Sequence, residues 1–175
     1  ILLLSTMSFS VFPAIVLLPA YAKGVLGGGA DTLGFLMSAL GAGALVGALY
    51  MASRKSTKGL DKIISFSSLI LALMIAITGV TKYFYLSLLT LAIAGVTMIL
   101  TLSSINTLIQ TSTEEKMRGR VMSFYAMALM GTQPIGNLIL GAVASGIGVP
   151  ITILLGGVVT FIGGIIWRYF SQNNI

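Results

Sequence analysis

The chain has 175 residues, of which 57% are hydrophobic and only 8% are charged, with a net charge of +6. Soluble domains average about 45–50% apolar and about 25% charged residues. A water-soluble globule is therefore excluded, because too few charged side chains remain to cover its surface. Cysteine and histidine are both absent, so we expect no metal site, no disulfide and no cofactor held by these residue types. The basic residues interrupt apolar runs instead of forming a basic face, which argues against nucleic-acid binding.

The uncharged intervals predict the membrane spans in chain order. Each of the first three is close to the roughly 20 residues that cross a 30 Å hydrocarbon core. The long uncharged stretch after Arg120 is long enough for two crossings, and SGIGVP, residues 145–150, supplies the turn between them. Six spans are predicted, at about residues 1–22, 32–53, 63–81, 84–110, 121–144 and 150–168. The sequence predicts an all-α polytopic membrane protein.

Lysine and arginine positions predict the orientation of these spans. Only Lys23 and Lys82 fall on one side; on the other lie Arg54, Lys55, Lys58, Lys62, Lys116, Arg118, Arg120 and Arg168. The positive-inside rule makes the second side cytoplasmic. With six spans, both ends of the segment are then cytoplasmic, and the charged stretch EEKMRGR, residues 114–120, is expected to be the cytoplasmic loop between the fourth and fifth spans.

Small residues recur at helical spacing in two spans. Ala39, Gly43 and Gly47 repeat every four residues in the second span. In the fifth span Gly141 lies on a small-residue face, and Pro134 removes a backbone hydrogen bond and is expected to bend the helix. Such faces let helix backbones approach closely in lipid. Static packing and sliding during a conformational cycle both remain open.

Uncharged polar side chains mark a candidate substrate pathway. On the fourth span Thr97 and Thr101 share a face with other hydroxyls, and Asn106 and Gln110 form a second patch. The fifth span adds Tyr125, Gln133 and Asn137. These groups can line a watery cavity, bind a substrate or tie helices together, and these alternatives stay open. The carboxylates, Asp31, Asp61, Glu114 and Glu115, all fall in predicted loops, so we expect no enzymatic site.

The six spans also form two triplets with nearly constant offsets, and the odd number inverts the second triplet. With PAYAKGVLGGGADTLGFLMSALGAGALVGAL and EEKMRGRVMSFYAMALMGTQPIGNLILG, this order resembles helices seven to twelve of major facilitator superfamily transporters, in particular the drug:proton antiporter-3 branch of macrolide and enterobactin exporters. The resemblance implies a six-helix bundle of two inverted three-helix repeats, half of a transporter, whose N-terminal half is expected to precede it. The basic stretch SRKSTKGLDK, residues 53–62, departs from the Gly-x-x-x-Asp-Arg-x-Gly-Arg-Arg form of the superfamily's loop.

The resemblance further implies efflux of a small amphipathic compound, such as a drug or a siderophore, across the bacterial cytoplasmic membrane by alternating access. The implied partners are the lipid bilayer, the N-terminal half and the substrate. Arg118 and Arg120, with the basic residues Arg54, Lys55 and Lys58, would lie at the cytoplasmic gate. The alternative is a six-span scaffold that dimerises through its glycine-rich faces without transporting alone.

Overall fold

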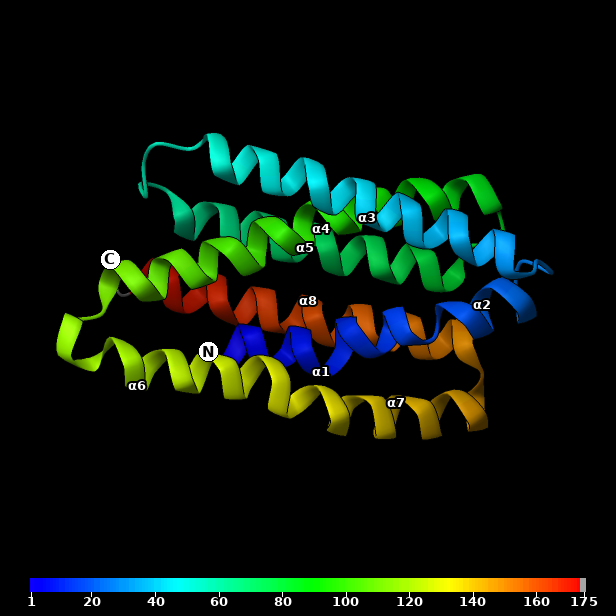
Figure 1. Ribbon diagram of the computed structural model, residues 1–175. Coiled ribbons are helices and arrows are strands. Elements are labelled where there is room, and N and C mark those ends of the chain that lie inside the picture. The colour runs from blue at the N-terminus through cyan, green and yellow to red at the C-terminus, as the bar shows by residue number, and fades with distance from the viewer. Residues whose placement is uncertain (174–175) are drawn as a thin grey trace.

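The computed structural model describes residues 1–173, and every regular element in that part of the chain is helical (Figure 1). In chain order the elements are α1 (Leu2–Val16), α2 (Leu18–Gly24), α3 (Ala30–Ser53), α4 (Leu60–Val80), α5 (Phe84–Ser112), α6 (Glu115–Ala126), the π-helical segment η1 (Met127–Gly131), α7 (Thr132–Ile147) and α8 (Val149–Asn173). Within residues 1–173, five helices are long and apolar enough to cross a membrane, and the pair α1 and α2, bent by 41°, makes a sixth. The predicted all-α polytopic fold is confirmed.

The charged segment before the fifth span is helical, so its prediction as a loop is wrong. Helix α6 begins at Glu115 and continues through η1 and α7 to Ile147, a length of 33 residues. Glutamate, lysine, methionine and arginine are good helix formers, and Glu115 in the first turn is favourable to the helix dipole. At 1.5 Å per residue this helix is about 50 Å long, which exceeds a 30 Å hydrocarbon core. Charge therefore marks where the chain leaves lipid, and the helix extends beyond that point.

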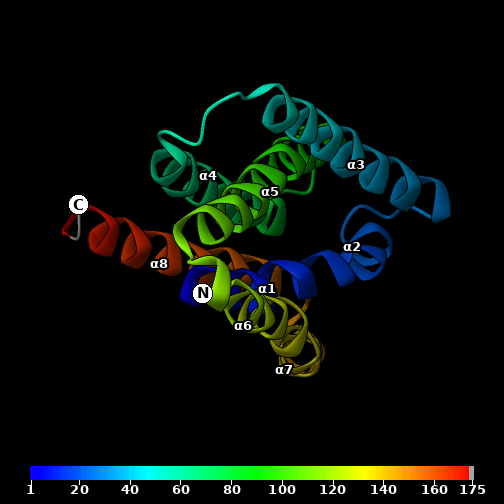
Figure 2. The same ribbon diagram turned by 60° about the vertical axis from the view of Figure 1, so that its left-hand side comes forward.

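The first helix triplet consists of α1 with α2, α3 and α4, and the second consists of α5, α6 with α7, and α8. The first member of each triplet packs against the other two members of the opposite triplet. Helix α5 packs against α3 and α4, whereas α1 packs against α7 and α8, and contacts between α4 and α8 join these two groups. Both views show α3, α4 and α5 on one side and α1, α7 and α8 on the other (Figures 1 and 2). Swapping the first triplet for the second leaves this set of contacts unchanged. The contact pattern is the one expected of an inverted repeat.

Glycines bring the second helix of one repeat onto the first helix of the other. A Cβ at Gly43 of α3 would lie 1.9 Å from the carbonyl oxygen of Ala92 on α5, and one at Gly47 would lie 2.7 Å from that of Val96. Gly43 and Gly47 are both buried. Because α5 already covers this face, it is not available for dimerisation of the kind the scaffold alternative requires.

The other repeat has the same arrangement. A Cβ at Gly136 of α7 would lie 2.3 Å from the carbonyl oxygen of Phe9 on α1. Phe9 lies four residues before Pro13, which has no N–H to donate to that carbonyl. The missing side chain of Gly136 lets α7 approach α1 at this break in the hydrogen-bond pattern. By contrast, a Cβ at Gly141 would meet nothing within 4 Å, so the predicted packing role of Gly141 does not apply inside this bundle.

Tyr21 joins three segments at the end of the bundle away from the basic loop. Its buried hydroxyl donates to the carbonyl of Thr81 at 2.9 Å and pairs with the hydroxyl of Ser87 at 2.8 Å. We expect Tyr21→Phe to destabilise the protein by about 1–3 kcal/mol, because the buried Thr81 carbonyl loses its partner. The midpoint of thermal unfolding in detergent measures this effect. Tyr83→Phe is the matched control, since the Tyr83 side chain is 76% exposed, and equal midpoints for the two variants would contradict the prediction.

Candidate functional site

The hydroxyl face of α5 lies inside the bundle. Thr101 is fully buried and its hydroxyl pairs with Ser67 of α4 at 2.7 Å. Nearer the N-terminus of α5, Thr90 pairs with Thr78 of α4 at 2.8 Å. Thr97 is also buried, and its hydroxyl donates to carbonyls of its own helix. The Thr101 and Thr90 pairs tie α4 to α5, so for these two hydroxyls the structural tie is the interpretation that the geometry supports.

Three of the predicted pathway residues meet where α5 and α6 approach each other. The Gln110 amide donates to Oδ1 of Asn106, and the side chain of Asn106 also interacts with the Tyr125 hydroxyl. Tyr125 is buried, Asn106 is half-buried and Gln110 is exposed. We call these three residues the amide cluster. Its neutral hydrogen-bond donors and acceptors form a row from the interior to the surface. The row lies at the end of the bundle where the charged segment of α6 begins.

A π-helical turn interrupts the fifth span, a feature that the sequence analysis missed. It covers Met127–Gly131 and ends three residues before Pro134. The carbonyl of Leu129 lies five residues before Pro134, so its π-type donor position is a proline without an N–H. The hydroxyl of Ser8 on α1 donates to the Leu129 carbonyl instead. The helix is continuous from Glu115 to Ile147 and contains the proline together with this π turn, at the place where the sequence predicts a bend. Pro134 was the only signal of it in the sequence.

Gln133 and Asn137 follow the π turn on α7 and lie one helical turn apart. Both side chains are half-buried. The Oδ1 atom of Asn137 is buried and has no hydrogen-bond partner among the described residues. Leaving a buried acceptor unsatisfied costs about 1–3 kcal/mol, and most such groups in folded proteins have a partner. The position therefore offers an acceptor for a donor that is not part of this bundle.

The predicted gate residues divide by environment. The Arg54 guanidinium donates to the Lys58 carbonyl at 2.7 Å and so closes the loop between α3 and α4. Lys55 and Lys58 are exposed, as are Arg118 and Arg120 on the first turns of α6. Arg54 thus shapes its own loop, whereas the other four present their charges outward at one end of the bundle.

Comparison with known families decides the identity of this fold. A family of the major facilitator superfamily, described as transmembrane secretion effector, matches residues 1–174. The chain belongs to the transmembrane secretion effector family. The match supports a membrane transporter of the major facilitator type, which agrees with the superfamily resemblance seen in the sequence. No curated protein matched the chain significantly. In this secretion effector the exchanged triplets have the contact pattern of inverted transporter repeats, and the neutral polar groups of α5 to α7 are candidates for a pathway.

Proposed function

We propose that this secretion effector segment is the C-terminal six-helix half of an efflux transporter of the bacterial cytoplasmic membrane, and not an enzyme. It would move a small amphipathic compound by alternating access against an N-terminal half, with both of its own ends in the cytoplasm. Family membership and the exchanged repeats support the transporter, and the excess of lysine and arginine at one end supports the orientation.

The unpartnered acceptor of Asn137 carries the assignment of the pathway. Oδ1 of Asn137 is buried without a donor, and Gln133 presents a second amide one turn away. A compound with a hydroxyl or amide donor would satisfy the Asn137 oxygen while its apolar part contacts the surrounding aliphatic side chains. The amide cluster extends this neutral lining toward the basic end. Thr97 and Thr101 are left out of the proposed pathway, because the Thr101 hydroxyl pairs with Ser67 of α4 and the Thr97 hydroxyl bonds to carbonyls of its own helix.

Efflux measurements on the full-length protein test this proposal. We expect Asn137→Ala and Gln133→Ala to weaken transport about 2- to 12-fold, the equivalent of losing one hydrogen bond of roughly 0.5–1.5 kcal/mol. The readout is accumulation of the compound in cells that express equal amounts of each variant. Asn137→Ala should leave the thermal midpoint of the substrate-free protein unchanged or raised, because Oδ1 has no partner to lose.

Ser145→Ala is the matched control on the same helix. The Ser145 hydroxyl is exposed and donates only to the carbonyl of Ala142 on its own helix, at 2.7 Å, so this variant should transport normally. Unchanged efflux in well-expressed Asn137→Ala and Gln133→Ala would remove α7 from the pathway.

A further inference from the structure

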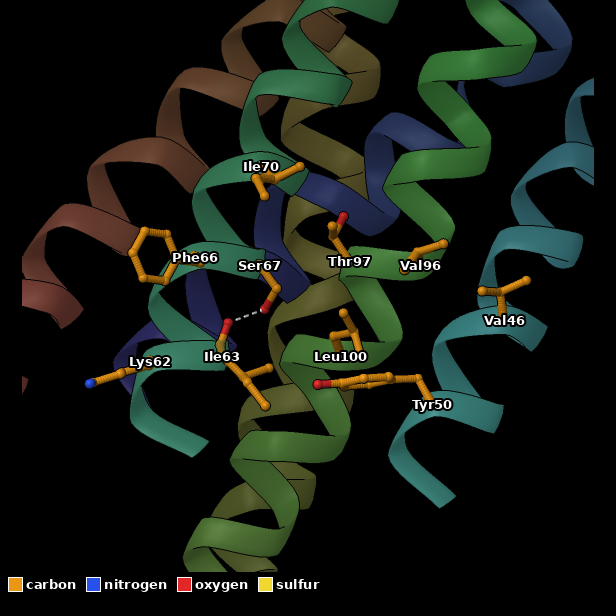
Figure 3. Close-up of a pocket in the computed structure, with 10 residues that line it drawn as sticks. All are labelled: Val46, Tyr50, Lys62, Ile63, Phe66, Ser67, Ile70, Val96, Thr97 and Leu100. Atoms are coloured by element: carbon orange, nitrogen blue, oxygen red, sulfur yellow. Dashed lines mark hydrogen bonds between the residues drawn. The ribbon is translucent and has the colours of Figure 1, made fainter. Parts of the chain in front are cut away.

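An apolar groove opens on the side of the bundle formed by α3, α4 and α5. Its volume is about 400 Å³, within the roughly 300–1,000 Å³ typical of small-molecule sites. Figure 3 shows its walls, with Val46 and Tyr50 from α3, Ile63 and Ile70 from α4, and Leu100 from α5. Three helices thus leave a channel on their outer surface that is lined mainly by aliphatic and aromatic side chains.

The groove has the depth of one lipid leaflet. Along α4 it extends from Lys62 to Ile70, eight residues or roughly 12 Å at 1.5 Å per residue. Half of a 30 Å hydrocarbon core is about 15 Å. Lys62 lies near the start of α4, next to the basic loop, and Ile70 lies near the helix middle. A hydrocarbon chain that follows the groove would therefore reach from the headgroup level toward the bilayer centre.

A second, basic pocket adjoins the groove on the other side of α4. It has a volume of about 700 Å³ and shares Lys62 and Phe66 with the groove. Arg168 of α8 contributes to it, with its guanidinium carbon 5.7 Å from the centre of the Phe66 ring. In Figure 3 the Lys62 ammonium and the Phe66 ring point away from Thr97. The pocket also contains one carboxylate, Asp61, so its two cations leave a net positive charge.

We propose that the groove and the basic pocket together bind one anionic phospholipid. An acyl chain would occupy the groove, and the phosphate would lie between Lys62 and Arg168. Charge complementarity selects the occupant, because the cations lie at the headgroup end, and the remaining depth is uncharged and mostly apolar, with Ser67 and Thr97 contributing hydroxyls. Basic pockets between membrane helices bind the headgroups of anionic lipids in this way. The site is separate from Asn137 and Gln133, so lipid binding would act on the transporter independently of the proposed substrate pathway.

Lipid titration of the purified full-length protein tests the proposal. Native mass spectrometry would compare phosphatidylglycerol with phosphatidylcholine of the same acyl chains, and we expect phosphatidylglycerol to bind more tightly. In the variant K62Q/R168Q this binding should weaken about 30-fold, which is about 2 kcal/mol at 1.4 kcal/mol per tenfold and roughly 1 kcal/mol for each cation. Both side chains are exposed, so the variant should fold, and its thermal midpoint in detergent checks this.

Two further variants separate the site from general charge attraction. K55Q/K58Q removes the same charge from exposed positions of the neighbouring loop, and it should retain the preference for phosphatidylglycerol. Ile70→Trp fills the groove from a partly exposed position and should weaken both lipids. The proposal fails if wild type shows no preference, as it would if another part of the transporter covered this face, or if K55Q/K58Q weakens binding as much as K62Q/R168Q. Efflux by these variants is measured separately, so a failed lipid site leaves the transport proposal untouched.

Discussion

Gly43→Ala is expected to destabilise the protein by at least about 1–3 kcal/mol, and Gly43→Leu to prevent its folding. A Cβ at this position would lie 1.9 Å from the carbonyl oxygen of Ala92, which belongs to the backbone of α5. A backbone atom cannot move aside as a flexible side chain can, so α3 and α5 would have to separate. Overpacking of well-packed interiors costs typically 1–3 kcal/mol. The loss of close contact along the whole helix pair adds to that cost.

Gly41→Ala is the matched control for this prediction. Gly41 lies on the same helix, but a Cβ there would meet nothing within 4 Å. Alanine is favoured over glycine in a helix interior by about 1 kcal/mol, so this variant should be neutral or slightly stabilising. Thermal unfolding of the purified protein, followed by size-exclusion chromatography, compares the two. Equal midpoints for Gly41→Ala and Gly43→Ala would show that α3 and α5 are not in contact as described.

Cysteine labelling from outside intact cells is expected to give an all-or-none result for orientation. This chain has no cysteine, so it contributes no background of its own. Ser56→Cys lies in the basic loop between α3 and α4, and Lys82→Cys lies in the loop between α4 and α5; both positions are exposed. A membrane-impermeant maleimide should label Lys82→Cys fully and leave Ser56→Cys unlabelled, because the positive-inside rule places the basic loop in the cytoplasm.

Permeabilised cells supply the control for the labelling experiment. Both positions should react once the membrane is opened, which shows that an unlabelled cysteine is protected by the bilayer and not buried by the fold. If Ser56→Cys alone were labelled in intact cells, the orientation would be the opposite of the one proposed. It would also place the proposed lipid site in the other leaflet.

The sequence predicts the helices well because lipid imposes a simple requirement on them. Each uncharged interval long enough to cross the membrane contains a helix, since backbone groups in hydrocarbon must be hydrogen-bonded within the chain. Helix ends follow a different rule. The charged residues after Glu114 favour water, but they also favour a helix. The loop prediction failed there because charge indicates where the chain leaves lipid and does not indicate where a helix ends.

The polar residues show what sequence spacing cannot resolve. Thr97 and Thr101 share a helical face in the sequence, but only the structure shows that α4 places Ser67 opposite Thr101. The π turn likewise depends on a partner distant in the chain, because Ser8 lies on α1 and its acceptor on η1. A single sequence gives the periodicity of each helix, and it does not say which two helices face each other. The sequence therefore could not show that Thr101 has a partner within the described residues and that the Asn137 oxygen has none.

The exchange of first helices between the triplets has a consequence for biosynthesis. Ser8 and its acceptor Leu129 are 121 residues apart. At a synthesis rate of roughly 5–20 residues per second, α1 precedes η1 by about 6–24 s. Helix α5 is complete at Ser112, before η1 is made, so α3, α4 and α5 can associate while α1 still faces lipid or the insertion machinery. Assembly of this bundle is therefore expected to end, and not to begin, with its amino-terminal helix.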